Sequence, residues 1–186
     1  RAHSILDFTD RSRIECAPMY ILILRHADAG DPRVFATSNS DDRQRPLSAK
    51  GRRRMAEIAL GLRRVQPALD LIFSSPLTRA LQTAEILQQA FPKAARAPAK
   101  ELAPGGERKH LMKRLSKLPA DSTLALIGHE PDLSELVAWL AAGSDFSFME
   151  VKKGAACLLK SVGKPGPASA ELLWALAPKQ LRQLGN

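Results

Sequence analysis

Cysteine is scarce in this chain. Its 186 residues include only Cys16 and Cys157, and the two are not spaced as metal ligands. Cys157 lies in an apolar run, where a buried free thiol is the expected state. Two cysteines with no sign of pairing favour a reducing, cytoplasmic location over an oxidising compartment.

Long apolar runs are also missing, so we expect no membrane span. Residues 1–18 lack the basic start, apolar centre and small-residue cleavage site of a secretory signal. Because Met19 stands directly before the first strand pattern, residues 1–18 are predicted to be a leader or an added extension, with a native N-terminal arm as the alternative. No long linker divides residues 19–186, which are predicted to form a single domain.

Aromatic residues are absent from the most basic part of the sequence. Lysine and arginine number 28 against 19 acidic residues, and much of the excess lies between residues 43 and 64, including "GRRRM". Such a run is commonly a solvated helix face, and Arg52, Arg53 and Arg54 cannot all face one site. Alternatively it attracts anions, such as phosphorylated substrates, acidic proteins or nucleic acid. Proteins that stack nucleic-acid bases interleave aromatics with the charge, so the composition disfavours nucleic acid.

Three short apolar runs are present: "MYILIL", "LDLIF" and "TLALIG". None alternates with polar residues, which is typical of strands buried on both faces in a parallel sheet. Helical spacing follows in "PLSAKGRRRMAEIALGLRRV", where Ser48 is a suitable N-cap. Further helices are predicted in "SPLTRALQTAEILQQAF", "GERKHLMKRLSKL" and "PDLSELVAWLAAG", the last closed by Gly143.

The alternation of strands and helices predicts an α/β fold with three α/β/α layers and a mainly parallel central sheet. The C-terminal third differs, because "GAACLLKSV" and "SAELLWALA" flank the turn-forming "GKPGPA". We therefore expect a C-terminal β-hairpin that joins the sheet. A short helix over "PKQLRQL" is predicted to close the chain.

Polar residues follow each of the three buried strands. The first ends in Arg25 and His26, the second in "SS" with Arg79 one helical turn later, and the third in Gly128 and His129. The carboxyl ends of parallel strands share one edge of the sheet, where ligands bind in open α/β folds. The two histidines and two arginines are therefore expected to converge.

This combination points to phosphate chemistry. The planar guanidinium matches phosphate oxygens in pairs, and Arg79 lies in the first turn of its helix, where free backbone N–H groups also favour an anion. The sequence has no Walker-type glycine loop and no His-Glu-x-x-His metal motif. What remains is a metal-free phosphate site flanked by histidine, and histidine can act as a covalent nucleophile.

The sequence resembles the histidine phosphatase superfamily, whose members are phosphoglycerate mutase-like. The similarity lies in "LILRHADAG", "RPLSAKG", "SSPLTRALQTAEIL" and "LALIGHEPDLSELV", in that order, and it extends from Met19 to the C-terminus. The short length and the closing "LLWALAPKQL" are most similar to the SixA-type phosphohistidine phosphatases. The second motif has Arg79 and Thr83 in the expected places.

The resemblance implies roles for individual residues. His26 would be the nucleophile that becomes phosphorylated, while Arg25, Arg79 and His129 would hold the phosphate oxygens. Arg45 of the "RPLS" loop would be a fifth contact. Ala27 departs from the glycine usual in the family, a small change that costs little backbone freedom.

The proton donor is the least defined part of this prediction. Many family members use a carboxylate to protonate the leaving oxygen, and Asp28, Asp42, Glu101 and Glu107 are all candidates here. Glu107 follows the "ELAPGG" turn and is the leading one.

The resulting hypothesis is a cofactor-independent, cytoplasmic phosphatase in signal transduction that removes phosphate from phosphohistidine in a protein. A small-molecule phosphomonoesterase or mutase is the first alternative. A non-catalytic module that binds phosphate or another protein is the second.

Overall fold

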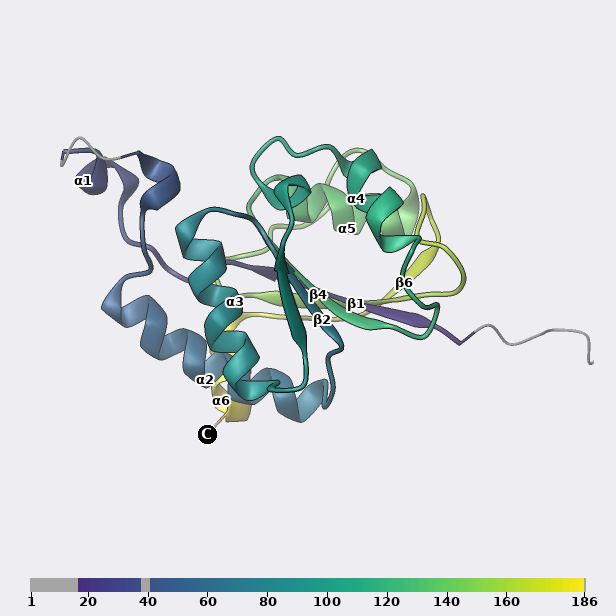
Figure 1. Ribbon diagram of the computed structural model, residues 1–186, viewed down its shortest axis with the longest axis horizontal. Helices are drawn as coiled ribbons and strands as arrows, with labels where there is room; N and C mark the ends of the chain where they lie inside the picture. The colour runs from purple at the N-terminus through teal and green to yellow at the C-terminus, as the bar shows by residue number, and fades with distance from the viewer. Residues whose placement is uncertain (1–16, 38–40, 186) are drawn as a thin grey trace, which may run out of the picture.

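A single six-stranded sheet forms the centre of the computed structural model, which describes residues 17–37 and 41–185. Its strand order is β3-β2-β4-β1-β5-β6 (Figure 1). The strands are β1 (Met19–Arg25), β2 (Leu71–Ser74), β3 (Ala95–Pro98), β4 (Thr123–Gly128), β5 (Ala156–Ser161) and β6 (Ala170–Leu176). The first four run parallel, β5 is antiparallel to β1, and β6 is antiparallel to β5. The predicted hairpin is therefore confirmed.

Helices cover both faces of the sheet (Figure 1). They are α1 (Pro32–Ala36), α2 (Ala49–Val65), α3 (Thr78–Ala90), α4 (Arg108–Leu115), α5 (Asp132–Ala142) and α6 (Pro178–Gly185), with short 3₁₀ turns η1 (Asp42–Gln44) and η2 (Lys100–Leu102). Residues of α2, α3 and α6 pack into one core, and residues of α4 and α5 pack into the other. The three-layer α/β/α prediction is confirmed.

Strand β1 shows why its sequence does not alternate. Leu22 and Leu24 point into the core beneath α2, α3 and α6, whereas Ile21 and Ile23 point into the core beneath α4 and α5. All four side chains are 0% exposed. A strand in the middle of a covered sheet buries both of its faces, so every position is apolar.

Local sequence signals fix where two of these helices begin or end. The Ser48 hydroxyl accepts a hydrogen bond from the Gly51 amide at 2.9 Å and caps α2, as predicted. Gly143 ends α5 in the left-handed conformation, with φ of 69°. The buried residues of α3 include Ala80, Ala84 and Leu87, whereas Leu81 is half-buried.

Cys157 is buried on β5 and free, as expected. Within residues 17–37 and 41–185, no helix is both long and apolar enough to cross a membrane. The expectation for residues 1–18 concerns positions that lie outside the described residues, apart from the last two.

Candidate active site

The ends of β1, β2 and β4 meet at one edge of the sheet. Arg25 pairs in register with Gly128, and Ser74 pairs with Ile127. The residues that follow these strands are therefore neighbours. The rings of His26 and His129 lie 5.0 Å apart between centroids, although the residues are far apart in sequence.

The hydrogen bonding of His26 defines which of its nitrogens can react. Its Nδ1 lies 2.7 Å from the backbone carbonyl oxygen of Ala27. A carbonyl oxygen can only accept a hydrogen bond, so Nδ1 carries the proton and Nε2 keeps its lone pair. Burial lowers the pKa of His26 to about 3, and the positive charges of Arg79 and Arg25 contribute. The ring is therefore neutral at pH 7, as a nucleophile must be.

Thr83 ties the segment around His26 to helix α3. Its hydroxyl accepts a hydrogen bond from the Ala27 amide at 3.1 Å and donates one to the carbonyl of Arg79 at 2.7 Å. The side chain is fully buried. The path of the chain around His26 is thus fixed relative to the first turn of α3, which carries Arg79.

His129 is held by Ser75 at the end of β2. Its Nε2 lies 2.8 Å from the Ser75 hydroxyl oxygen, and both residues are buried. Burial, together with the charges of Arg79 and Arg25, lowers the pKa of His129 to about 4. The sequence marked Ser75 only as a strand end, because a serine that orients a distant histidine has no local signature.

The two arginines each keep an unpartnered donor. Nη1 of Arg25 donates to the carbonyl of Val151 at 3.0 Å, and Nη1 of Arg79 donates to the carbonyl of Asp42 at 2.9 Å. In contrast, the Nε atoms of both arginines are buried without a hydrogen-bond partner among the described residues. A buried donor without an acceptor costs free energy, and an oxyanion between the arginines would remove that cost.

Comparison with known proteins agrees with this geometry. Residues 21–105 match the model of the histidine phosphatase superfamily (branch 1). An uncharacterised protein of Picosynechococcus sp. is 34% identical over 145 residues, which cover 77% of this chain and 86% of that protein. The chain belongs to the histidine phosphatase superfamily.

Solved structures of other members share the fold. The protein histidine phosphatase SixA, solved with tungstate, superposes with a TM-score of 0.74 at 23% identity, covering 88% of this chain and 99% of that one. Phosphoglycerate mutase from Plasmodium falciparum superposes with a TM-score of 0.61 at 14% identity, covering 85% of this chain and 90% of that one. These likenesses show the histidine phosphatase fold, and they leave the substrate to be argued from the site.

In this histidine phosphatase, Arg45 donates hydrogen bonds to three protein oxygens. Its Nε donates to Oδ1 of Asp42 at 2.7 Å, and its Nη1 donates to the carbonyls of Ala29 and Gly30. Oδ2 of Asp42 in turn lies 3.2 Å from Nη1 of Arg79. Arg45 therefore holds the β1–α1 loop and, through Asp42, the guanidinium of Arg79.

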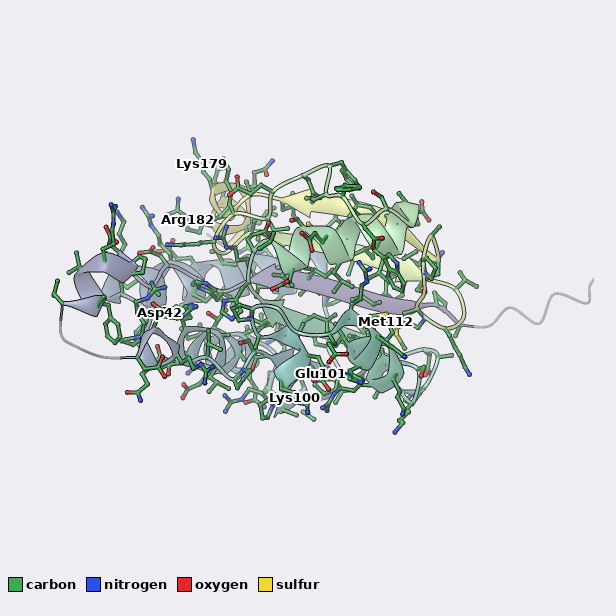
Figure 2. The ribbon with its side chains drawn as sticks, turned by 90° about the horizontal axis from the view of Figure 1, so that it is seen from above. Asp42, Lys100, Glu101, Met112, Lys179 and Arg182 are labelled. Carbon is green, nitrogen blue, oxygen red and sulfur yellow. The ribbon has the colours of Figure 1, made fainter. Side chains whose placement is uncertain are left out.

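The four predicted proton donors lie in different surroundings, and Figure 2 labels two of them, Asp42 and Glu101. Asp42 bridges two arginines, Asp28 lines a groove beside Arg25, and Glu101 lines a small cavity against His129. Glu107 is exposed, with Oε2 3.3 Å from Nδ1 of His110, and it lines neither the groove beside Arg25 nor the cavity against His129.

Three of these carboxylates are held in the ionised form. The hydrogen bond from Arg45 lowers the pKa of Asp42. Burial opposes ionisation of Asp28, but hydrogen bonds from Ser48 and Lys153 outweigh it and the pKa is lowered. The pKa of Glu101 is also lowered, because hydrogen bonds from its own backbone and from Arg114 outweigh burial. None of the three is a ready proton donor at neutral pH.

Glu130 is a carboxylate that the sequence-based search for an acid passed over. It directly follows His129, and burial raises its pKa. Its Oε1 accepts a hydrogen bond from the Ser134 amide at 3.2 Å, at the start of α5. Its position next to a site histidine in "GHEPD" was the available signal. Among residues 17–37 and 41–185, no group of three or more histidine, cysteine or acidic side chains could hold a metal ion.

We expect both site histidines to remain neutral in mild acid. A histidine with the ordinary pKa of 6.5 is mostly protonated at pH 5, whereas pKa values of about 3 and about 4 leave His26 and His129 neutral there. An NMR titration of the imidazole resonances from pH 8 to pH 5 measures this directly. A midpoint near pH 6.5 for either ring would contradict the burial described above.

Proposed function

We propose that the protein hydrolyses phosphohistidine in another protein, through a phosphoryl group carried transiently on Nε2 of His26. The observation that carries this proposal is the pairing of a neutral nucleophile with carboxylates that are held ionised. His26 has a free lone pair on Nε2, while Asp28, Asp42 and Glu101 all have lowered pKa values. Such a site suits a leaving group that needs no proton.

In the first step, the lone pair of His26 Nε2 forms a bond to phosphorus as the N–P bond of the substrate breaks. The electron pair of that bond stays on the departing ring nitrogen. Because the other ring nitrogen of the substrate carries a proton, the leaving group is neutral imidazole. An alkoxide leaving group would instead need a proton delivered as the bond breaks.

In the second step, water attacks phosphorus and the bond to His26 breaks. Nε2 recovers its lone pair, inorganic phosphate leaves, and one proton of the water passes to solvent. The Nδ1–H of His26 stays hydrogen-bonded to the carbonyl oxygen of Ala27 throughout, so the His26 ring is also released from phosphorus as a neutral imidazole. The same property of imidazole thus serves both steps.

Arg25, Arg79 and His129 are proposed to hold the phosphoryl oxygens during both steps. The unpartnered Nε donors of the two arginines support this assignment. Fixed cationic donors stabilise the charge on the equatorial oxygens of a transferring phosphoryl group. The proposal assigns Arg45 to positioning as well as to phosphate contact, because Asp42 links it to Arg79.

A comparison of substrates tests the proposal. We expect kcat/KM on a protein phosphorylated on histidine to exceed that on alkyl and sugar phosphates by roughly a hundredfold or more, the usual contribution of general acid catalysis. The measurement uses one chemically phosphorylated histidine protein against a panel of phosphomonoesters, with p-nitrophenyl phosphate as a reference for turnover. No turnover of any member of the panel would favour a non-catalytic binding module.

The alternative is a small-molecule phosphomonoesterase or mutase, and Glu130 is the observation in its favour. A carboxyl group with a raised pKa beside His129 has the property of a proton donor. A sugar phosphate or a phosphoserine peptide turned over faster than phosphohistidine would establish this alternative.

A cytoplasmic location and a role in signal transduction are also part of what we propose. The free, buried thiol of Cys157 supports the cytoplasmic location.

A further inference from the structure

A groove of about 520 Å³ lies beside Arg25, which forms part of its lining. Four more cationic side chains line it: Arg54, Lys152, Lys153 and Arg182. Asp28 and Glu150 are the acidic residues in its lining. The groove therefore carries a surplus of positive charge next to the proposed phosphate site.

Close helix packing brings these cations together from distant parts of the chain. A Cβ atom at Gly51 would lie 2.0 Å from the carbonyl oxygen of Asp28, so α2 approaches the β1–α1 loop as only glycine allows. Gly61 and Gly185 likewise allow α2 and α6 to approach closely, because a Cβ atom at either position would collide with the backbone of the other helix. Arg54 therefore reaches the groove from α2 and Arg182 from α6, the helix on which Figure 2 labels it.

Part of this charge is not neutralised within the protein. Lys153 lies 3.4 Å from Asp28, Arg25 lies 3.6 Å from Glu150, and Arg182 lies 4.0 Å from a carboxylate of α2. By contrast, Arg54 and Lys152 are exposed and have no carboxylate within 4 Å in the described part of the chain. These two residues are available to an outside anion.

The loop that leads into the groove carries two aromatic side chains in solvent. Phe146 is 86% exposed and Phe148 is 60% exposed, between α5 and the groove residue Glu150. The loop is nevertheless anchored, because Asp145 pairs with Arg108 at one end and the carbonyl of Val151 accepts from Arg25 at the other. Exposed aromatics on an anchored segment are typical of the centre of protein–protein interfaces.

We propose that the groove and the Phe146–Phe148 loop form the docking surface for the substrate protein, and that this protein presents acidic and apolar side chains around its phosphohistidine. The inference rests on the proposed function and adds the chemistry of the partner to it. Charge complementarity selects an acidic segment. The exposed phenylalanines favour a polypeptide over a small phosphorylated metabolite, which would leave them in water.

Three probes test this surface: free phosphohistidine, a peptide in which aspartate, glutamate and leucine flank phosphohistidine, and the same peptide with asparagine and glutamine. We expect kcat/KM of the wild-type protein to be about tenfold higher on the acidic peptide than on the amide peptide, with the preference lost as salt is raised. R54E/K152E should remove the preference through KM, with turnover of free phosphohistidine within about twofold of wild type.

K93E/K117E is the matched control, because it makes the same change in net charge. Both lysines are exposed and precede β3 and β4, at the edge of the sheet opposite the site. This variant should keep the full preference, whereas F146S/F148S should lower kcat/KM on both leucine-containing peptides and leave turnover of free phosphohistidine unchanged. Equal rates on the two peptides, or equal losses in the groove variant and the control, would overturn the docking surface. A wild-type protein that hydrolyses none of the three probes would instead refute the proposed function.

Discussion

His26→Ala is expected to lower turnover by several orders of magnitude and to abolish phosphate transfer onto the protein. The variant removes the imidazole whose Nε2 lone pair is left free by the hydrogen bond between Nδ1 and the Ala27 carbonyl. A water molecule in place of the ring cannot carry a phosphoryl group on the protein, and Nε2 of His129 is already engaged by the Ser75 hydroxyl. The measurement exposes the protein briefly to labelled substrate, quenches the reaction and counts phosphate on the protein.

The chemistry of the label adds a second criterion. A phosphoramidate survives alkali and is lost in acid, unlike a phosphate ester on serine. His110→Ala is the matched control, since His110 is half-exposed and lies on α4, where it pairs with Glu107. This variant should label and turn over as the wild type does. Near-normal activity of the His26 variant would end the proposed mechanism.

Arg79→Lys is expected to lower kcat/KM by about two to three orders of magnitude, as the loss of a fixed electrostatic donor does in other enzymes. Arginine has several donors in one plane. Nη1 of Arg79 already contacts Asp42, which leaves Nε and Nη2 for the proposed contact with the phosphoryl group. Lysine keeps the charge, but its three N–H donors radiate from one atom and cannot reproduce the planar fork of the guanidinium. Inhibition by vanadate should weaken in parallel, since vanadate uses the same donors.

Arg63→Lys provides the comparison for this variant. Arg63 donates from Nη1 to the carbonyl of Ala90 and thus has a structural contact remote from the histidines. Its replacement should leave kcat/KM within a few-fold of wild type. If lysine at position 79 worked as well as arginine, Arg79 would act only as a distant charge, and the paired contact proposed above would be wrong.

The fold was predictable where local pattern and tertiary environment agree. The uninterrupted apolar run of β1 arises because both faces of that strand are buried, and Ser48 caps α2 through its own side chain. The convergence of His26 and His129 followed from a rule about parallel strands rather than from any local feature.

Other features were not predictable because they depend on partners far away in the sequence. Strand β3 is a short edge strand that contains an arginine and ends in proline, so it lacks the apolar run of its neighbour β2. The link from Arg45 through Asp42 to Arg79 joins a turn to a helix start. The four acid candidates could not be ranked, since their ionisation depends on Arg45, Arg114 and Lys153, which only the folded chain brings near.

The acceptor that selects the reactive nitrogen of His26 belongs to the main chain. No codon change at position 27 deletes a backbone carbonyl, and alanine in place of the family's usual glycine preserves it. The tautomer of the proposed nucleophile is therefore set by the path of the backbone, and a side-chain substitution at position 27 does not remove its acceptor. Thr83 is the side chain through which a mutation reaches it, because its hydroxyl holds the Ala27 amide. Substitutions that change the position of His26 are therefore expected at Thr83 of helix α3 before they are expected at position 27.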